Sequence, residues 1–279
     1  MSQERLSTRT TLSKFCPEGE GVSMNKLLAP FSLGRPVLIT YVPAGDPEFS
    51  RVILDAYLEG GADILEIGLP SGDPYMDGAT MGSSMKRAHA AGTDGNSIAQ
   101  VLIEWLLTAK RRPALLWMCY ADADFTDLEK WVEADVIDGV LMLGHHPEGF
   151  DQRLAALGVA LTVFVPWEYT EADEKLARAA TGYIMVPTRP GQTGTGTAAG
   201  DPSFLVKKMR AINKNVPVVA GFGVSDAPTA TRIMKSGADG VVVGTACIEA
   251  LFAHGNEGLR DNLQMISRAL KASDKEVKR

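Results

Sequence analysis

From residue 24 onwards, short apolar runs alternate with stretches in which apolar residues recur at helical spacing. Eight runs have the length of a strand and are apolar throughout, and a helical pattern follows each of them. The predicted strands are 36–44, 64–70, 114–120, 139–143, 160–166, 183–187, 216–222 and 240–244. The predicted helices are 48–60, 80–91, 96–110, 125–134, 148–157, 170–180, 202–213, 226–237, 246–253 and 257–272, after a short helical segment at 25–30.

This order of elements predicts an α/β fold with a parallel sheet. Strands without polar alternation are buried on both faces, which is typical of parallel sheets covered by helices. Eight strand–helix repeats in 279 residues predict a closed (β/α)8 TIM barrel. A doubly wound open sheet is the alternative, but no Gly-x-Gly-x-x-Gly follows the first strand. Without a linker or a shift in composition, we expect one barrel domain at 24–279, preceded by an N-terminal extension at 1–23 for which disorder is one expectation.

Composition narrows the function classes. The 45% apolar and 22% charged residues are typical of a globular protein, and a net charge of −6 disfavours nucleic-acid and anionic-membrane partners. No apolar run approaches the roughly 20 residues of a membrane span. Residues 1–23 lack the apolar core of a secretory signal, and their acidic residues disfavour a transit peptide. Cys16, Cys119 and Cys247 are far apart and indicate reduced thiols, so we expect a cytoplasmic protein.

The clearest candidate for chemistry is a carboxylate within the second predicted strand. Glu66 interrupts the apolar run 64–70, and an ionised carboxylate in apolar surroundings costs several kcal/mol unless it is paired or protonated. Asp77 follows in a loop rich in turn residues. The two acids could face one ligand and exchange protons with it. Alternatively, Glu66 pairs with a buried Arg or Lys, and Asp77 only shapes a turn.

Glycines at the ends of the last three predicted strands indicate an anion site. Loop 188–200 contains several glycines and threonines, Gly221-Phe222-Gly223 ends the seventh strand, and Gly244-Thr245 ends the eighth. Backbone N–H groups beside a helix N-terminus bind phosphate, and the loops after strands seven and eight are the usual phosphate position in such barrels. The alternative is that these glycines only permit close packing of helix against strand.

Other candidates are weaker. His145 and His146 are adjacent, so they point to opposite faces of a strand, and nothing nearby completes a metal site. Gln192-Thr-Gly-Thr-Gly is not followed by Lys, so it is not a P-loop. Cys119 has no obvious His partner and is interpreted as a core residue. We therefore expect no metal.

Together these segments resemble the tryptophan synthase alpha subunit family. The strand and loop Ile64-Leu-Glu-Ile-Gly-Leu-Pro70 and Ser71-Gly-Asp-Pro-Tyr-Met-Asp-Gly78 match its signature. Further matches are Tyr41-Val-Pro-Ala-Gly-Asp-Pro47, Arg189-Pro-Gly-Gln-Thr-Gly194, Gly221-Phe-Gly223 and Gly244-Thr245. The resemblance runs in order from about residue 25 to 272 and covers nearly the whole chain.

The resemblance implies retro-aldol cleavage of indole-3-glycerol phosphate to indole and D-glyceraldehyde 3-phosphate. It makes Glu66 the general acid/base and Asp77 the acceptor of the indole N–H hydrogen bond. Thr193 would contact the loop of Asp77 when loop 188–200 closes. The phosphate would bind at Gly194, Gly223, Gly244 and Thr245. The indole pocket would be formed by Phe222 with Tyr41, Met118 and Tyr120. No cofactor or metal is implied.

The resemblance also implies a partner, a PLP-dependent beta subunit in an α2β2 complex, contacted through Pro70, Asp73 and Pro74. Several residues depart from the family pattern near the site, namely Ser71, Gly72, Ala79, Gly82, His145, His146 and Met185. These departures leave three alternatives open: a stand-alone lyase of a specialised indole pathway, a weakly active binding or activating subunit for a beta-type partner, and another phosphosugar barrel enzyme.

Overall fold

A computed structural model describes residues 25–48, 51–191 and 201–277 of the chain. The N-terminal extension predicted at 1–23 therefore lies outside the described residues, as does most of the glycine- and threonine-rich loop after the sixth strand.

Eight parallel strands close into a barrel in sequence order, with the last strand paired to the first. The strands are β1 (Val37–Val42), β2 (Ile64–Gly68), β3 (Ala114–Tyr120), β4 (Gly139–Leu143), β5 (Ala160–Phe164), β6 (Ile184–Pro187), β7 (Val218–Gly221) and β8 (Gly240–Val243). The predicted (β/α)8 barrel is confirmed. Several predicted strands were too long at their ends; β7, for example, begins after Pro217, which lacks the N–H that a sheet requires.

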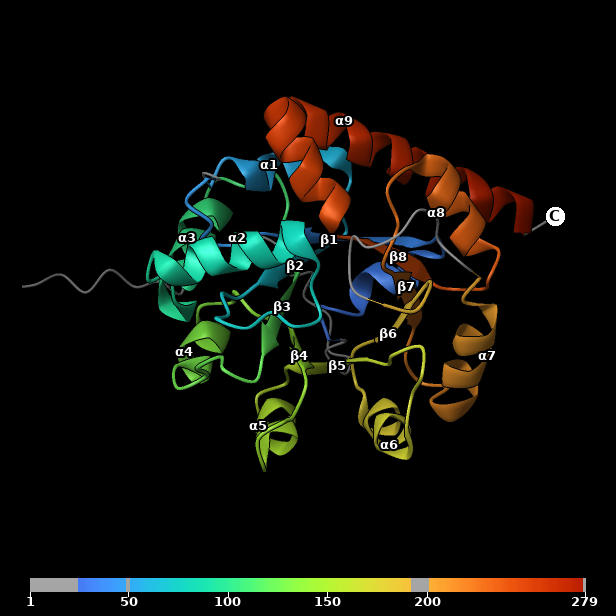
Figure 1. Ribbon diagram of the computed structural model, residues 1–279, viewed down its shortest axis with the longest axis horizontal. Helices are drawn as coiled ribbons and strands as arrows, with labels where there is room; N and C mark the ends of the chain where they lie inside the picture. Colours follow the sequence, from blue (N-terminus) through green and yellow to red (C-terminus); the bar gives the residue numbers. More distant parts are fainter. Residues whose placement is uncertain (1–24, 49–50, 192–200, 278–279) are drawn as a thin grey trace, which may run out of the picture.

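Helices surround the strands (Figure 1). They are α1 (Ile53–Gly60), α2 (Ala79–Ala90), α3 (Gly95–Leu106), α4 (Leu128–Glu133), α5 (Phe150–Ala156), α6 (Glu171–Ala179), α7 (Ser203–Ile212), α8 (Ala227–Met234) and α9 (Thr245–Val277). The helix expected at 25–30 is instead the 3-10 segment η3 (Ala29–Leu33), which ends at a left-handed Gly34. The two helices expected at the C-terminus form one element, α9, kinked at Gly255 with φ of 63°. Within the described residues, no helix is long and apolar enough to cross a membrane.

Side chains alternate between two cores along each strand. One core lies between the strands and the helices, and the other fills the barrel interior. Along β2, Ile64 points inward and Leu65 outward, so Glu66 also faces the interior. Because nearly every strand position is buried, the prediction of strands covered on both faces is confirmed.

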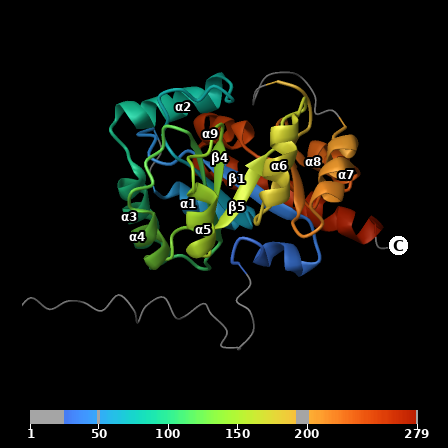
Figure 2. The same ribbon diagram turned by 90° about the horizontal axis from the view of Figure 1, so that it is seen from below.

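The N-terminal end of the barrel is closed by the segment before β1. In Figure 2 this segment lies beneath the strands, at the end opposite α2. Leu27 is fully buried, and a Cβ added at Gly139 would lie 2.6 Å from its Cδ2 atom. Phe31 packs beside Tyr183 with ring centroids 6.1 Å apart. This closure leaves the opposite end, where the strands terminate, as the mouth of the barrel.

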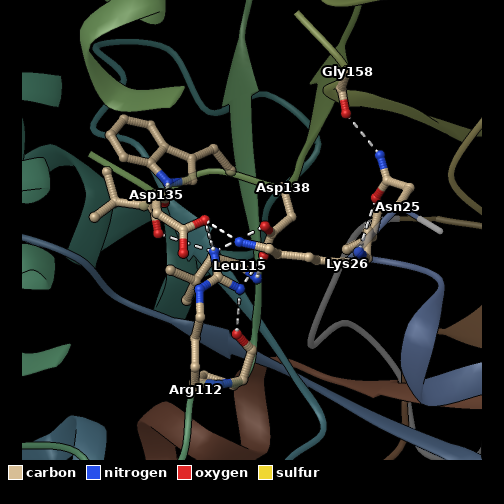
Figure 3. Close-up of polar contacts among 11 residues, drawn as sticks. Asn25, Lys26, Arg112, Leu115, Asp135, Asp138 and Gly158 are labelled. Carbon is tan, nitrogen blue, oxygen red and sulfur yellow. Dashed lines mark hydrogen bonds and ion pairs between the residues drawn. The ribbon is translucent and has the colours of Figure 1, made fainter. Parts of the chain in front are cut away.

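Aspartates that immediately precede strands fasten this closed end. Asp138 accepts the backbone N–H of Leu115 at 2.7 Å and both terminal nitrogens of Arg112 at 2.8 Å (Figure 3). The same Arg112 bonds Asp135, which also pairs with Lys26 at 2.5 Å. Asp63 makes an equivalent set of bonds to Leu38 N and both terminal nitrogens of Arg35. Asp239 accepts from Val218 N and from one nitrogen of Arg210. The repeated arrangement ties neighbouring strands together far from the mouth.

We expect Arg112→Leu to lower the free energy of unfolding by about 3–5 kcal/mol, because it leaves buried Asp138 without its counter-charge. Arg178→Leu, which removes an exposed pair with Glu174, is the matched control and should cost less than about 1 kcal/mol. Urea unfolding measures both. Equal losses in the two variants would contradict the assigned importance of the buried pair.

Candidate active site

Glu66 lies at the centre of the barrel interior. It is paired in register with Tyr41 of β1 and Leu116 of β3, and only 3% of its surface is exposed. Its side chain accepts a long hydrogen bond of 3.4 Å from the hydroxyl of Tyr183, which precedes β6 on the opposite side of the barrel. The strand therefore places the carboxyl group on the barrel axis, where inward-facing residues are otherwise mostly apolar.

No Arg or Lys neutralises Glu66 among the residues that the structure describes. Burial, which is the largest cause, and the negative charge of Asp77 together raise the pKa of this carboxyl from 4.5 to about 8, while the Tyr183 hydrogen bond opposes the rise. The alternative that Glu66 pairs with a buried Arg or Lys is thus not realised within the described part of the chain. A carboxyl with a pKa near neutrality is suited to both giving and taking a proton.

Asp77 comes from the loop between β2 and α2. It is 8% exposed and accepts a hydrogen bond of 2.8 Å from the hydroxyl of Tyr120 at the end of β3. The ring of Tyr120 in turn packs edge-on against Tyr75, with centroids 5.2 Å apart. The hydrogen bond from Tyr120 thereby fixes the position of the Asp77 carboxylate.

Contacts to neighbouring loops hold the Asp77 loop and the helix that follows it. At the start of the loop, Asp122 accepts hydrogen bonds from the Ser71 hydroxyl at 3.0 Å and from the Gly72 N–H at 3.1 Å. In the last turn of α2, Arg87 forms an ion pair of 2.6 Å with buried Asp46 from the loop after β1. Ser71 and Gly72, which depart from the family pattern, are thus part of a bridge between two loops.

A cavity of about 290 Å³ opens above Glu66 at the mouth of the barrel. Both acids line it, together with side chains from most of the strands and from the loops at their ends. The lining residues described by the structure are Tyr41, Glu66, Met76, Asp77, Met81, Met118, Leu143, Met185, Arg189, Phe222, Gly223, Val224, Ser225, Val242, Gly244, Thr245, Ala246 and Glu249.

One side of this cavity is built from the ends of β7 and β8. Gly223 has φ of 90°, and Phe222 before it adopts φ of 66°, which is uncommon for a residue with a side chain. Phe222 is held by a hydrogen bond from the Thr188 hydroxyl to its carbonyl and by stacking on Phe164 at 5.1 Å. Helix α9 begins at Thr245, so N–H groups of its first turn face this side of the cavity.

The structure brings most of the predicted site residues together. Glu66, Asp77, Tyr41, Met118, Phe222, Gly223, Gly244 and Thr245 all line the cavity. Tyr120 stands outside the lining and contacts Asp77 instead. Thr193 and Gly194 lie outside the described residues.

Several groups that line the cavity were not predicted from the sequence. Arg189 is the only basic side chain in the described lining, and its buried Nε has no hydrogen-bond partner among the described residues. One indication of its role was present in the sequence, since Arg189 is the one charged residue in loop 188–200. Glu249, Met76 and Met81 gave no local signal, because they reach the cavity from helices or a loop.

The remaining candidates have structural partners. The Nδ1 atom of His146 lies 3.0 Å from an Asp151 carboxylate oxygen, and the thiols of Cys119 and Cys247 are free and buried. In the part of the chain that the structure describes, no group of three or more His, Cys, Asp or Glu residues is placed to hold a metal ion.

A closed barrel whose mouth holds two acids beside glycine-bearing strand ends is the arrangement of a (β/α)8 barrel enzyme that uses acid–base chemistry on an anionic substrate. Residues 31–276 match the family model described as tryptophan synthase alpha chain, and the chain belongs to that family.

Individual relatives agree with the family match. The tryptophan synthase alpha chain of Dechloromonas aromatica is 31% identical over 258 residues, covering 88% of this chain and 95% of the relative. That of Geotalea uraniireducens is 33% identical, covering 86% and 92% respectively. Among solved structures, tryptophan synthase from Mycobacterium tuberculosis superposes with a TM-score of 0.75 at 23% identity, covering 88% of this chain and 96% of that one, which supports the fold.

Proposed function

We propose that this chain cleaves indole-3-glycerol phosphate to indole and D-glyceraldehyde 3-phosphate, with Glu66 as the general acid/base and Asp77 as the partner of the indole N–H. The observation that carries the assignment of roles is the placement of Glu66. It is a buried carboxyl of raised pKa that has no basic counter-charge in residues 25–48, 51–191 and 201–277, and it shares one cavity with a second acid.

The proposed reaction needs a proton on the ring carbon C3 before the carbon–carbon bond can break. Protonated Glu66 donates that proton, and the indole becomes cationic with an acidic N–H. Asp77 accepts the N–H hydrogen bond and compensates the positive charge. The Glu66 carboxylate then takes the proton of the side-chain hydroxyl next to the ring. The carbon–carbon bond breaks, an aldehyde forms, and both the ring and Glu66 return to their starting states.

The cavity walls suit the two ends of this substrate. Four methionines, Met76, Met81, Met118 and Met185, and the ring of Phe222 offer soft apolar surface to an indole. On the other side, Gly223, Gly244, Thr245 and the start of α9 offer N–H groups to a phosphate. Arg189 supplies positive charge to the same cavity. Gly194, outside the described residues, belongs to the proposed phosphate site.

The family works with a beta subunit. We propose a surface of this chain that contacts it. The loop after β2 presents Asp73 to solvent, and its carboxylate makes no ion pair among the described residues. Beside it, Tyr75 is 49% exposed. An exposed acid next to an exposed aromatic ring supports docking of a partner through Asp73, with half-buried Pro70 nearby. Pro74, the third residue of the predicted contact set, is buried within the chain. A cytoplasmic location is part of the proposal, supported by the free thiols of Cys119 and Cys247.

The test of this function is indole release from indole-3-glycerol phosphate by the purified chain, with and without a tryptophan synthase beta subunit. We expect indole in both cases and a higher rate with the partner. If the chain released indole at the same rate with and without the beta subunit, the result would argue against the docking surface and leave the proposed chemistry unaffected. Absence of indole under both conditions would remove the proposed reaction.

In the same assay, Asp73→Ala should reduce the stimulation by the beta subunit about tenfold while leaving the rate without partner unchanged, since Asp73 stands outside the cavity. Glu133→Ala is the matched control, because Glu133 is an exposed acid at the end of α4, near the closed end of the barrel. Equal stimulation of wild type and Asp73→Ala would exclude Asp73 from the interface.

A further inference from the structure

The hydroxyl of Tyr41 is a buried polar group that the proposed chemistry has not used. Tyr41 is only 1% exposed, and its Oη atom has no hydrogen-bond partner among the described residues. A buried hydroxyl without a hydrogen-bond partner is destabilising, so its position needs a reason. Tyr41 also lines the cavity that holds both acids.

The fold aims this hydroxyl across the top of Glu66. Tyr41 is the register partner of Glu66 on the neighbouring strand, so both side chains enter the barrel side by side. The ring then reaches over Gly68, two residues nearer the mouth than Glu66 and on the same face of β2. A Cβ added at Gly68 would lie 2.2 Å from the Tyr41 Oη atom. The absence of a side chain at Gly68 therefore makes room for the hydroxyl on the mouth side of Glu66.

A substrate that contacts Glu66 in this cavity therefore also meets the side chain of Tyr41. Met185, which lines the cavity from β6, offers only a thioether and no donor. Tyr183 holds Glu66 itself from the far side. Among the described residues, Tyr41 is consequently the tyrosine that is placed to donate a hydrogen bond to a substrate oxygen next to Glu66.

We propose that Tyr41 is a catalytic residue whose O–H donates a hydrogen bond to the substrate hydroxyl that becomes the aldehyde. This inference rests on the proposed function. As Glu66 removes the proton of that hydroxyl, negative charge develops on its oxygen until the carbon–carbon bond breaks and the C=O bond forms. A fixed donor at this oxygen stabilises the developing charge, and Tyr41 keeps its own proton throughout.

The surroundings of Tyr41 favour the neutral phenol that this role requires. Burial raises the pKa of Tyr41 well above its usual range, and the negative charges of Asp77, Glu66 and Asp46 raise it further. Both effects favour the protonated hydroxyl, which is the form that can donate a hydrogen bond.

The test compares Tyr41→Phe with wild type, since this change removes the hydroxyl and keeps the ring. We expect kcat for indole release to fall about 10²-fold, the typical cost of losing one donor to a developing oxyanion, with little change in KM. Tyr57→Phe is the matched control. Tyr57 is fully buried on α1, next to Cys247 and outside the cavity, and its loss should leave kcat unchanged.

A second measurement separates this role from packing. An analogue in which a propyl phosphate chain replaces the glycerol phosphate chain lacks the reacting hydroxyl, so wild type and Tyr41→Phe should bind it equally in calorimetry. Weaker binding of this analogue to Tyr41→Phe would overturn the proposal in favour of a structural role. An unchanged kcat in Tyr41→Phe would also overturn it. Failure of the proposed function looks different, because the wild-type chain would then release no indole at all.

Discussion

Glu66→Gln is expected to lower kcat for indole release by about 10³-fold or more, because Gln can neither give nor take the proton that the reaction moves twice. The variant keeps the size of the side chain and can still accept the hydrogen bond from Tyr183. Glu66→Asp, which retains the carboxyl but withdraws it by one methylene, should lie between Gln and wild type. Indole formation measured at saturating substrate checks all three. A Gln variant within a few fold of wild type would falsify the role assigned to Glu66.

The pH dependence of the wild-type enzyme follows from the same group. Because the pKa of Glu66 is raised to about 8, the protonated form that begins the reaction dominates below this pH. We expect kcat/KM to be flat from about pH 7, where the substrate phosphate is a dianion, and to fall roughly tenfold per pH unit above 8. A descending limb beginning near pH 5 would show that Glu66 titrates as an ordinary carboxyl.

The raised pKa also has a cost in stability, with a defined sign. The folded state holds the Glu66 proton up to about pH 8, whereas the unfolded chain releases it near its usual value of 4.5. The contribution of the protonated form to stability is complete below about pH 4.5 and is lost as the pH rises to 8. Glu66→Gln lacks this loss, so its free energy of unfolding relative to wild type should rise by about 2–5 kcal/mol between pH 5 and pH 9.

The central position of Glu66 was predictable because it follows from local rules. A run of apolar residues predicts a strand buried on both faces, and a single acid within it must lie in a core or a site. The same reasoning placed the glycine-bearing ends of β7 and β8, since the strand ends of a barrel share one rim. Both predictions needed only the apolar runs that mark the strands and the rule that eight strand–helix repeats close into a barrel.

Other parts of the site depend on contacts between distant segments and left no local pattern. Tyr183 reaches Glu66 across 117 residues of sequence, and the strand β6 that follows it is apolar. The space over Gly68 that admits the Tyr41 hydroxyl exists only because two strands pair in one register. Similarly, the bridge from Ser71 to Asp122 joins two loops whose sequences show only turn residues. Such contacts are fixed by the closed barrel and not by the segments themselves.

Asp77→Asn is expected to lower kcat by about 10²–10³-fold, since the amide cannot compensate the positive charge that the indole acquires on protonation. The substitution preserves the size of the side chain and an oxygen that can accept from Tyr120. It should also change Glu66. The charge of Asp77 raises the pKa of Glu66, so its removal should lower that pKa and move the descending limb of kcat/KM to lower pH.

Asp73→Asn, assayed without a beta subunit, is the matched control for this change. It removes the same charge from the same loop, but at an exposed position outside the cavity, so both the rate and the pH limb should match wild type. A loss of rate in Asp77→Asn without movement of the pH limb would mean that Asp77 acts too far from Glu66 for their charges to interact. Only a carboxylate inside the cavity faces Glu66 through poorly solvated space, so Asp73 should have no effect on the pKa of Glu66. If the descending limb also moved in Asp73→Asn, the pKa of Glu66 would depend on the charge of the loop as a whole and not on Asp77 in particular.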